Sequence, residues 1–299
     1  MSLIDFGKSL QQRAVDIHSG KRIVFHHVPK CGGTSVGRAL RRAYLLSQET
    51  VTPDASMKAF EAVREGRPHL AAGDVSELRE MMLLYMLYSD TRCISAHIPF
   101  SDPAFRRFSD RYLFVTLLRD PVDRFISNYY WSHQHPGGVG HIAESLEDFL
   151  PTKRARHLGS TYVRYFCGEP AQDFTGRHVE AAIRNLRRMD CVGFLDQVGR
   201  FTSDLRQLTG KRIRIGRENV RNTGGKRDSI LSGPLGKQVL EACRFDSEIW
   251  EAVQDLRSSP PEARQGHRTA GPGGHFPGTS SGGFTAAIRS PGQAPCVPI

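Results

Sequence analysis

Two hydrophobic periodicities alternate along the chain and predict strands and helices in turn. Short apolar runs predict buried β-strands. These strands are expected at residues 22–28, 91–96, 112–118, 191–194 and 212–215. Longer stretches whose apolar residues return at every third or fourth position predict amphipathic helices. These helices are expected at residues 34–46, 76–87, 121–131, 179–189, 198–208 and 235–256.

Alternating strands and helices are typical of an α/β fold with a mainly parallel sheet covered by helices on both faces. In such sheets ligands bind beyond the carboxyl ends of the strands. The pattern stops near Ser258, where glycine, proline and serine dominate and apolar periodicity is lost. We therefore expect one α/β domain over residues 1–257 and a disordered tail over residues 258–299.

Charge narrows the class of ligand. The chain of 299 residues has a net charge of +10. The expected tail holds three arginines and one glutamate, so the remaining residues carry +8. This balance fits an anionic partner such as a phosphorylated cofactor, an acidic polymer, a nucleic acid or a membrane surface, and it equally fits a surface that is merely basic.

Cysteine usage and hydropathy bear on location. The six cysteines are scattered without a CxxC pair or a metal-type spacing, which indicates reduced thiols. The N-terminal residues lack the apolar segment of a signal peptide, and the longest apolar run, residues 81–88, is too short to span a bilayer. We expect a cytoplasmic protein with no stable membrane insertion.

The stretch "FHHVPKCGGTSVGRAL", residues 25–40, predicts a strand that turns directly into a helix. Gly32 and Gly33 permit a tight turn with close backbone approach, while Thr34 and Ser35 open the helix. Free N–H groups then converge on one point, and Lys30 adds a positive charge, as in a phosphate-binding loop. The lysine precedes the glycines, unlike the GxxxxGK[ST] loop of nucleoside-triphosphate enzymes, which disfavours a kinase or NTPase. A plain structural turn is the alternative.

The stretch "YLFVTLLRDPVDRFISNYYW", residues 112–131, predicts a buried strand followed by a helix. Asp120 can cap this helix, and Pro121 suits its first position. The apolar stripe leaves Arg124 and Ser127 on other faces. Arg119 and Ser127 are therefore candidates for a second anion site, although an arginine at a strand end fits an ion pair equally well.

Together these two stretches resemble the sulfotransferase superfamily, and specifically its carbohydrate branch, which includes heparan sulfate 2-O-sulfotransferases and bacterial relatives. The resemblance implies a P-loop-kinase-like α/β sheet. It also implies that 3′-phosphoadenosine 5′-phosphosulfate (PAPS) donates a sulfuryl group to a hydroxyl of a carbohydrate, glycolipid or other acceptor, with no metal.

The resemblance also assigns residues. The loop that holds the 5′-phosphosulfate corresponds to Lys30, Cys31, Gly32, Gly33, Thr34 and Ser35. Arg119 and Ser127 correspond to the pair that binds the 3′-phosphate. A late loop that closes over the nucleotide corresponds to Arg221, Lys226 and Arg227. Cys31 stands where relatives commonly carry threonine, and a thiol beside a lysine at a helix start can have a lowered pKa and be sensitive to oxidation.

Sulfuryl transfer needs a base and positive charge at the leaving phosphate. The resemblance assigns the base to His97 and the charge to Lys30; by itself, His97 equally fits a buried structural histidine. The candidate acceptor-binding residues are His133, His135, Arg154 and Arg156. Basic and aromatic residues around position 160 suit an anionic glycan, single-stranded RNA or a solvated helix face. The alternative functions are a P-loop-type kinase or NTPase and a basic nucleic-acid-binding protein; no recognition motif for nucleic acid is found.

Overall fold

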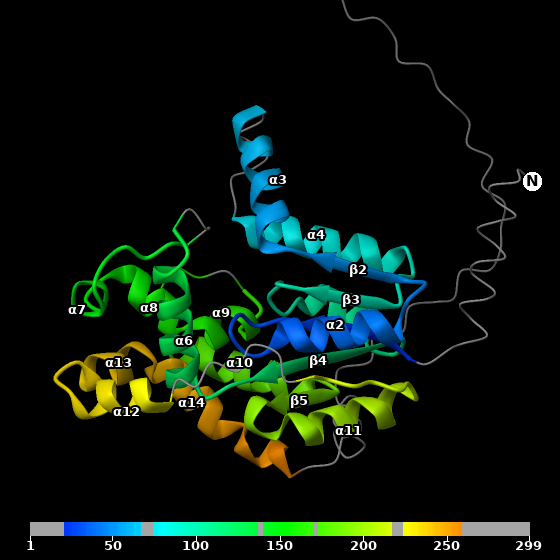
Figure 1. Cartoon of the computed structure of the whole chain (residues 1–299). Coiled ribbons are helices and arrows are strands. Elements are labelled where there is room, and N and C mark those ends of the chain that lie inside the picture. The colour runs from blue at the N-terminus through cyan, green and yellow to red at the C-terminus, as the bar shows by residue number, and fades with distance from the viewer. Residues whose placement is uncertain are drawn as a thin grey trace, which may run out of the picture. The chain divides into compact units, whose positions relative to one another are not determined.

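The computed structural model describes residues 21–66, 74–136, 140–169, 171, 173–216 and 224–258. In these residues five strands form one parallel sheet in the order β2-β3-β1-β4-β5 (Figure 1). The strands are β1 (Arg22–His26), β2 (Gln48–Val51), β3 (Cys93–Ala96), β4 (Tyr112–Leu118) and β5 (Cys191–Phe194). The predicted parallel sheet is therefore confirmed.

Side chains of the central strands alternate between two buried faces, as the two-residue period of a strand requires. On β1, Ile23 and Phe25 join one core cluster while Val24 joins the other. On β4, Val115 faces the first cluster and Phe114 the second. Both faces of the sheet are thus covered, as the apolar runs predict.

Helices from distant parts of the chain supply the other side of each cluster. The first face packs against α2 (Gly33–Ala43) and α11 (Val198–Thr209). The second face packs against α4 (Val75–Tyr88), α5 (Asp102–Phe108), α9 (Thr161–Phe166), α10 (Gly176–Arg188) and α14 (Arg244–Ala252).

A third cluster gathers helices that follow β4 and the end of the domain. It joins α6 (Pro121–His133), α7 (Leu146–Phe149), α8 (Lys153–Gly159) and α13 (Gly236–Ala242), with side chains of α12 (Gly224–Ser232) packed against it. In Figure 1 these helices lie to one side of the strands. The remaining elements are α3 (Pro53–Gly66), η2 (Leu195–Gln197) and η3 (Gln254–Arg257).

One predicted strand is wrong and one real strand was not predicted. Residues 212–215 form no strand; Ile213 instead buries its side chain against α11, and its carbonyl accepts a hydrogen bond from Arg206 Nε at 2.6 Å. The alternation there reflects Ile213 and, in part, Ile215 packing against the core without joining the sheet. At the sheet edge, β2 has polar residues at its first three positions, and only Val51 is buried, so no apolar run marks it.

Two helix predictions also need correction. The helix expected over residues 235–256 is interrupted at Cys243 and is divided into α13, α14 and η3. Arg124 does not face away from the core: its side chain and that of Asp246 are both 0% exposed, with Nη2 and Oδ2 3.5 Å apart. Helix α6 is enclosed by α8 and α14 as well as by its apolar neighbours, so more than one of its faces is buried. Beyond Ser258, the predicted tail lies outside the described residues.

Candidate functional site

The turn after β1 forms a glycine-lined cradle. Lys30 and Gly32 both have left-handed backbone conformations, with φ of 65° and 78°. A Cβ at Gly32 would lie 2.7 Å from Leu195 Cδ1, and one at Gly33 would lie 1.9 Å from the ring of His27. Side chains at either glycine would therefore clash, which explains the glycine pair.

The cradle opens directly into the N-terminus of α2. This helix has no acidic residue in its first turn, and no side chain caps it. The N–H groups at a helix start lack partners within the helix and carry partial positive charge. The loop therefore offers backbone donors to an anion.

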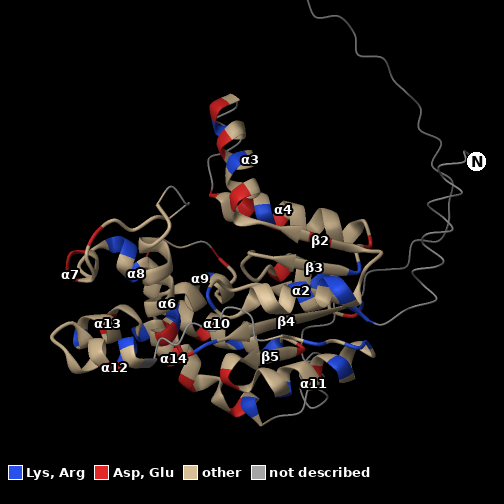
Figure 2. Cartoon of the chain, viewed as in Figure 1, with Lys and Arg blue, Asp and Glu red and all other residues tan. Residues whose placement is uncertain are grey.

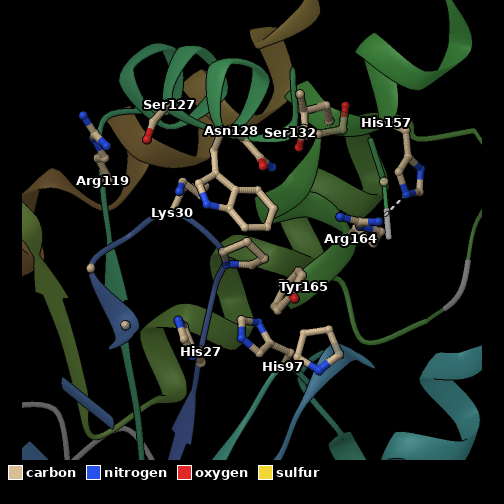
Figure 3. A pocket seen from close by; sticks show the side chains of 18 of the residues that line it. His27, Lys30, His97, Arg119, Ser127, Asn128, Ser132, His157, Arg164 and Tyr165 are labelled. Carbon is tan, nitrogen blue, oxygen red and sulfur yellow. Dashed lines mark hydrogen bonds between the residues drawn. The ribbon is translucent and has the colours of Figure 1, made fainter. Parts of the chain in front are cut away.

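This cradle lines a cleft of about 2080 Å³ that also receives the second predicted stretch (Figure 3). Arg119 follows β4, and Ser127 lies two turns into α6; both line the cleft with Lys30. Asp120 fixes the start of α6 as expected, because its carboxylate accepts a hydrogen bond from the Asp123 N–H at 3.0 Å. The two stretches predicted to bind anions thus share one cleft.

His97 follows β3 and faces the same cleft. Its ring lies 3.9 Å from that of His27, centroid to centroid. Burial, assisted by the nearby charge of Arg79, lowers the pKa of His97 to about 4, and burial lowers the pKa of His27 well below its usual value. Both rings are therefore neutral at pH 7, which is the state that a general base requires.

The acceptor-side residues are divided. His135, Arg154 and Arg156 line the cleft, whereas His133 is not among the lining residues. The His133 ring nitrogen Nδ1 lies 2.9 Å from the Ile142 carbonyl oxygen. Arg154 pairs with Glu144 at 2.7 Å. In Figure 2 the basic residues of α8 lie on a ribbon segment near the acidic residues of α7.

Cys31 does not lie in the cleft lining. Its side chain is 1% exposed, and its sulfur lies 3.6 Å from the Tyr162 hydroxyl. Burial raises the pKa of the thiol, which outweighs the lowering by nearby arginines. The lowered pKa considered from the sequence is therefore wrong, because the side chain points away from the anion-binding donors.

The candidate late loop is only partly described. Lys226 lines the cleft, with its Nζ 4.2 Å from the ring centroid of Tyr130. Arg227 is absent from the lining and pairs with Asp120 and Asp123 at 3.6 and 3.3 Å. Arg221 lies outside the described residues.

Sequence reasoning missed several side chains of the cleft, labelled in Figure 3. Asn128, Ser132 and His157 line the cleft, as does Arg79. Tyr165, from the basic and aromatic stretch noted in the sequence, lines it too. Asn128 and Ser132 had a signal, since both follow Ser127 on the same helix. Arg79 had none: it lies on an apolar helix, and its Nε donates to Ser56 Oγ at 2.9 Å.

Within the described residues, no group of three or more His, Cys, Asp or Glu side chains is placed to hold a metal ion. None of the helices in that part of the chain has the length and apolar character needed to cross a membrane.

The structure is a parallel α/β sheet with an uncapped helix start after its central strand. Arg119 follows the neighbouring strand, and a neutral histidine faces the same cleft, an arrangement that suits an anionic ligand. Residues 13–145 match the family described as "Sulfotransferase family". The matched residues include the cradle, His97, Arg119 and Ser127.

Two individual proteins are similar. Heparan-sulfate 6-O-sulfotransferase 2 of Danio rerio is 29% identical over 174 residues, which cover 56% of this chain and 35% of that protein. The chain thus matches about a third of the length of this curated relative, and the relative is named for 6-O- rather than 2-O-sulfation. A solved structure of mouse sulfotransferase SULT7A1 complexed with PAP covers 82% of this chain and 88% of its own, with 12% identity and a TM-score of 0.36. A likeness at that level is too weak to bear on the site.

Proposed function

We propose that the protein is a sulfotransferase that moves a sulfuryl group from PAPS to a hydroxyl of a carbohydrate or glycoconjugate. The proposal rests on one observation: the cradle, Arg119, Ser127 and His97 line the same cleft. The match of residues 13–145 to the sulfotransferase family supports it. The cradle of residues 30–35 would hold the 5′-phosphosulfate through backbone donors, so Cys31 needs to contribute only its N–H.

Arg119 and Ser127 would bind the 3′-phosphate, with a cation and a neutral hydroxyl donor on one anion. Lys226 would approach the nucleotide from α12, and the resemblance adds Arg221 and Arg227 to the residues proposed to bind it. The 3′-phosphate distinguishes this donor from ATP and ADP, so these side chains decide which nucleotide binds.

The transfer breaks the bond between sulfur and the 5′-phosphate oxygen and forms a bond between sulfur and the acceptor oxygen. His97 takes the hydroxyl proton. Lys30 and the N–H groups of α2 stabilise the negative charge that grows on the departing phosphate. A bound anionic donor raises the pKa of the neighbouring histidine and so strengthens it as a base.

The acceptor side suits an anionic glycan. The cleft volume of about 2080 Å³ exceeds the roughly 300–1,000 Å³ of most small-molecule sites, which leaves space for an acceptor beside the nucleotide. Its lining includes Lys153, Arg154, Arg156 and Arg164. The name of the zebrafish relative supports a carbohydrate acceptor.

We also place the enzyme in the cytoplasm. The five cysteines within the described residues are buried free thiols, which fits a reducing compartment.

Calorimetric titration with 3′-phosphoadenosine 5′-phosphate (PAP) and, in parallel, with ADP tests the proposal without added metal. We expect PAP to bind at least about tenfold more tightly, since ADP lacks the 3′-phosphate. Equal binding, or no binding of either nucleotide, would contradict the proposal and favour a kinase or a nucleic-acid-binding protein. Loss of PAPS-dependent sulfation in His97→Ala, with PAP affinity unchanged, would identify the base.

A further inference from the structure

The hydroxyl of Tyr162 contacts both parts of the proposed donor site, the cradle and Arg119, from the buried side. It donates a hydrogen bond to the Arg119 carbonyl oxygen and accepts one from the Arg119 N–H at 2.8 Å. The sulfur of Cys31, the second residue of the cradle, lies 3.6 Å from the same oxygen. A tyrosine hydroxyl has one proton to donate and two lone pairs, so these three contacts use its whole capacity.

Tyr162 is itself held firmly. Its side chain is 0% exposed, and its backbone N–H donates to both carboxylate oxygens of Asp246, at 2.8 and 2.9 Å. The guanidinium carbon of Arg124 lies 5.6 Å from its ring centroid. The hydroxyl therefore belongs to a rigid, buried network that includes α6, α9 and α14.

Both Arg119 backbone groups bond to this one side chain. Since the Arg119 side chain leaves the backbone at the same residue, its position depends on where the hydroxyl holds the chain after β4. Cys31 ties the cradle to the same atom, so the hydroxyl relates the two anion-binding positions to each other.

We propose that Tyr162 is a positioning residue that sets the spacing between the cradle and Arg119, and so determines how well the site recognises a nucleotide with both 5′- and 3′-anionic groups. This inference rests on the proposed function. Its consequence is specific: loss of the hydroxyl weakens a ligand that spans both positions more than one that uses the cradle alone.

Tyr162→Phe removes only the hydroxyl, and calorimetry with PAP and ADP measures the result. We expect PAP affinity to fall about three- to tenfold, the range for loss of a hydrogen bond, with a smaller change for ADP. A merely structural role would weaken both nucleotides alike and leave their ratio unchanged, which would overturn the proposal.

Tyr112→Phe is the matched control. Tyr112 is also buried, lies at the opposite end of β4, and donates to the Leu87 carbonyl oxygen at 3.5 Å. We expect this variant to keep the wild-type ratio of PAP to ADP affinity.

A double variant tests whether Tyr162 acts through Arg119. In an Arg119→Ala background, the further change Tyr162→Phe should leave PAP affinity nearly unchanged. An equal loss in both backgrounds would refute action through Arg119. Wild-type protein with no preference for PAP would instead defeat the proposed function, so the two failures are distinguishable.

Discussion

Gly33→Ala tests whether the cradle packs against the ring of His27, which in turn contacts the ring of the candidate base His97. The new Cβ would lie 1.9 Å from Cδ2, 2.0 Å from Nε2 and 2.7 Å from Cγ of His27. Carbon atoms in contact prefer about 3.5–4.0 Å, so the ring or the loop must move by about 1.5 Å or more. The ring has little room, because it stacks on Phe25 at 5.6 Å and meets the His97 ring at 3.9 Å, centroid to centroid.

Overpacking of this kind costs about 1–3 kcal/mol. For a domain of this size each kcal/mol lowers the melting temperature by about 2–4 °C, so we expect a decrease of about 2–12 °C. PAP affinity should fall too, since the same movement displaces the donors of α2. Urea unfolding, thermal unfolding and calorimetry with PAP measure these effects.

Gly199→Ala is the matched control, because a Cβ at this helical glycine meets nothing within 4 Å. It should be neutral or stabilising by up to about 1 kcal/mol. Combining Gly33→Ala with His27→Ala removes the ring that causes the clash, so the second change should cost less in the double variant than alone. Equal stability of Gly33→Ala and Gly199→Ala would contradict this explanation. So would additive effects of Gly33→Ala and His27→Ala on the free energy of unfolding.

Two further predictions concern stability. Arg124→Met leaves the Asp246 carboxylate buried without its cation and should lower the free energy of unfolding by about 3–5 kcal/mol in urea; a loss below about 1 kcal/mol would show that the pair contributes little. Burial lowers the pKa of His26 from 6.5 to about 4, so the unfolded chain binds its proton first. Stability present above pH 6.5 should therefore be lost as the pH falls towards 4, by up to about 3 kcal/mol from this residue. Urea unfolding between pH 7 and 4 should show a shallower loss in His26→Phe, and identical slopes would contradict the assignment.

The parts of the site that the sequence predicted are those in which local geometry and chemistry coincide. A strand, a glycine turn and a helix start within residues 25–40 produce the cradle wherever the rest of the chain lies. Arg119 is at the end of a continuous apolar strand, and parallel strands bring their carboxyl ends to one edge. Its place at the same edge of the sheet as Lys30 was therefore expected from the pattern, and its assignment to the same ligand came from the resemblance.

The parts that could not be predicted depend on contacts between distant segments. Arg124 looked like a solvent-facing residue because helical spacing gives one stripe, whereas its neighbours on α8 and α14 come much later in the chain. Cys31 looked reactive because its local surroundings, a lysine and a helix start, favour a thiolate. Its burial against Tyr162 reverses that conclusion. The two residues are 131 positions apart, so local sequence cannot reveal their contact.

The donor side and the acceptor side of the cleft are built by different parts of the fold, so they can change independently. In the proposed function, donor recognition would rest on the cradle and Arg119, which the sheet and the buried network around Tyr162 hold in place. The candidate acceptor residues instead come from α6 and α8 and from the segments around them, which pack in a cluster separate from both faces of the sheet. Substitutions in that cluster can reshape the acceptor side while leaving β1, β4 and the cradle in place. We therefore expect changes such as Arg156→Ala to alter the choice of acceptor while PAP affinity stays at its wild-type value.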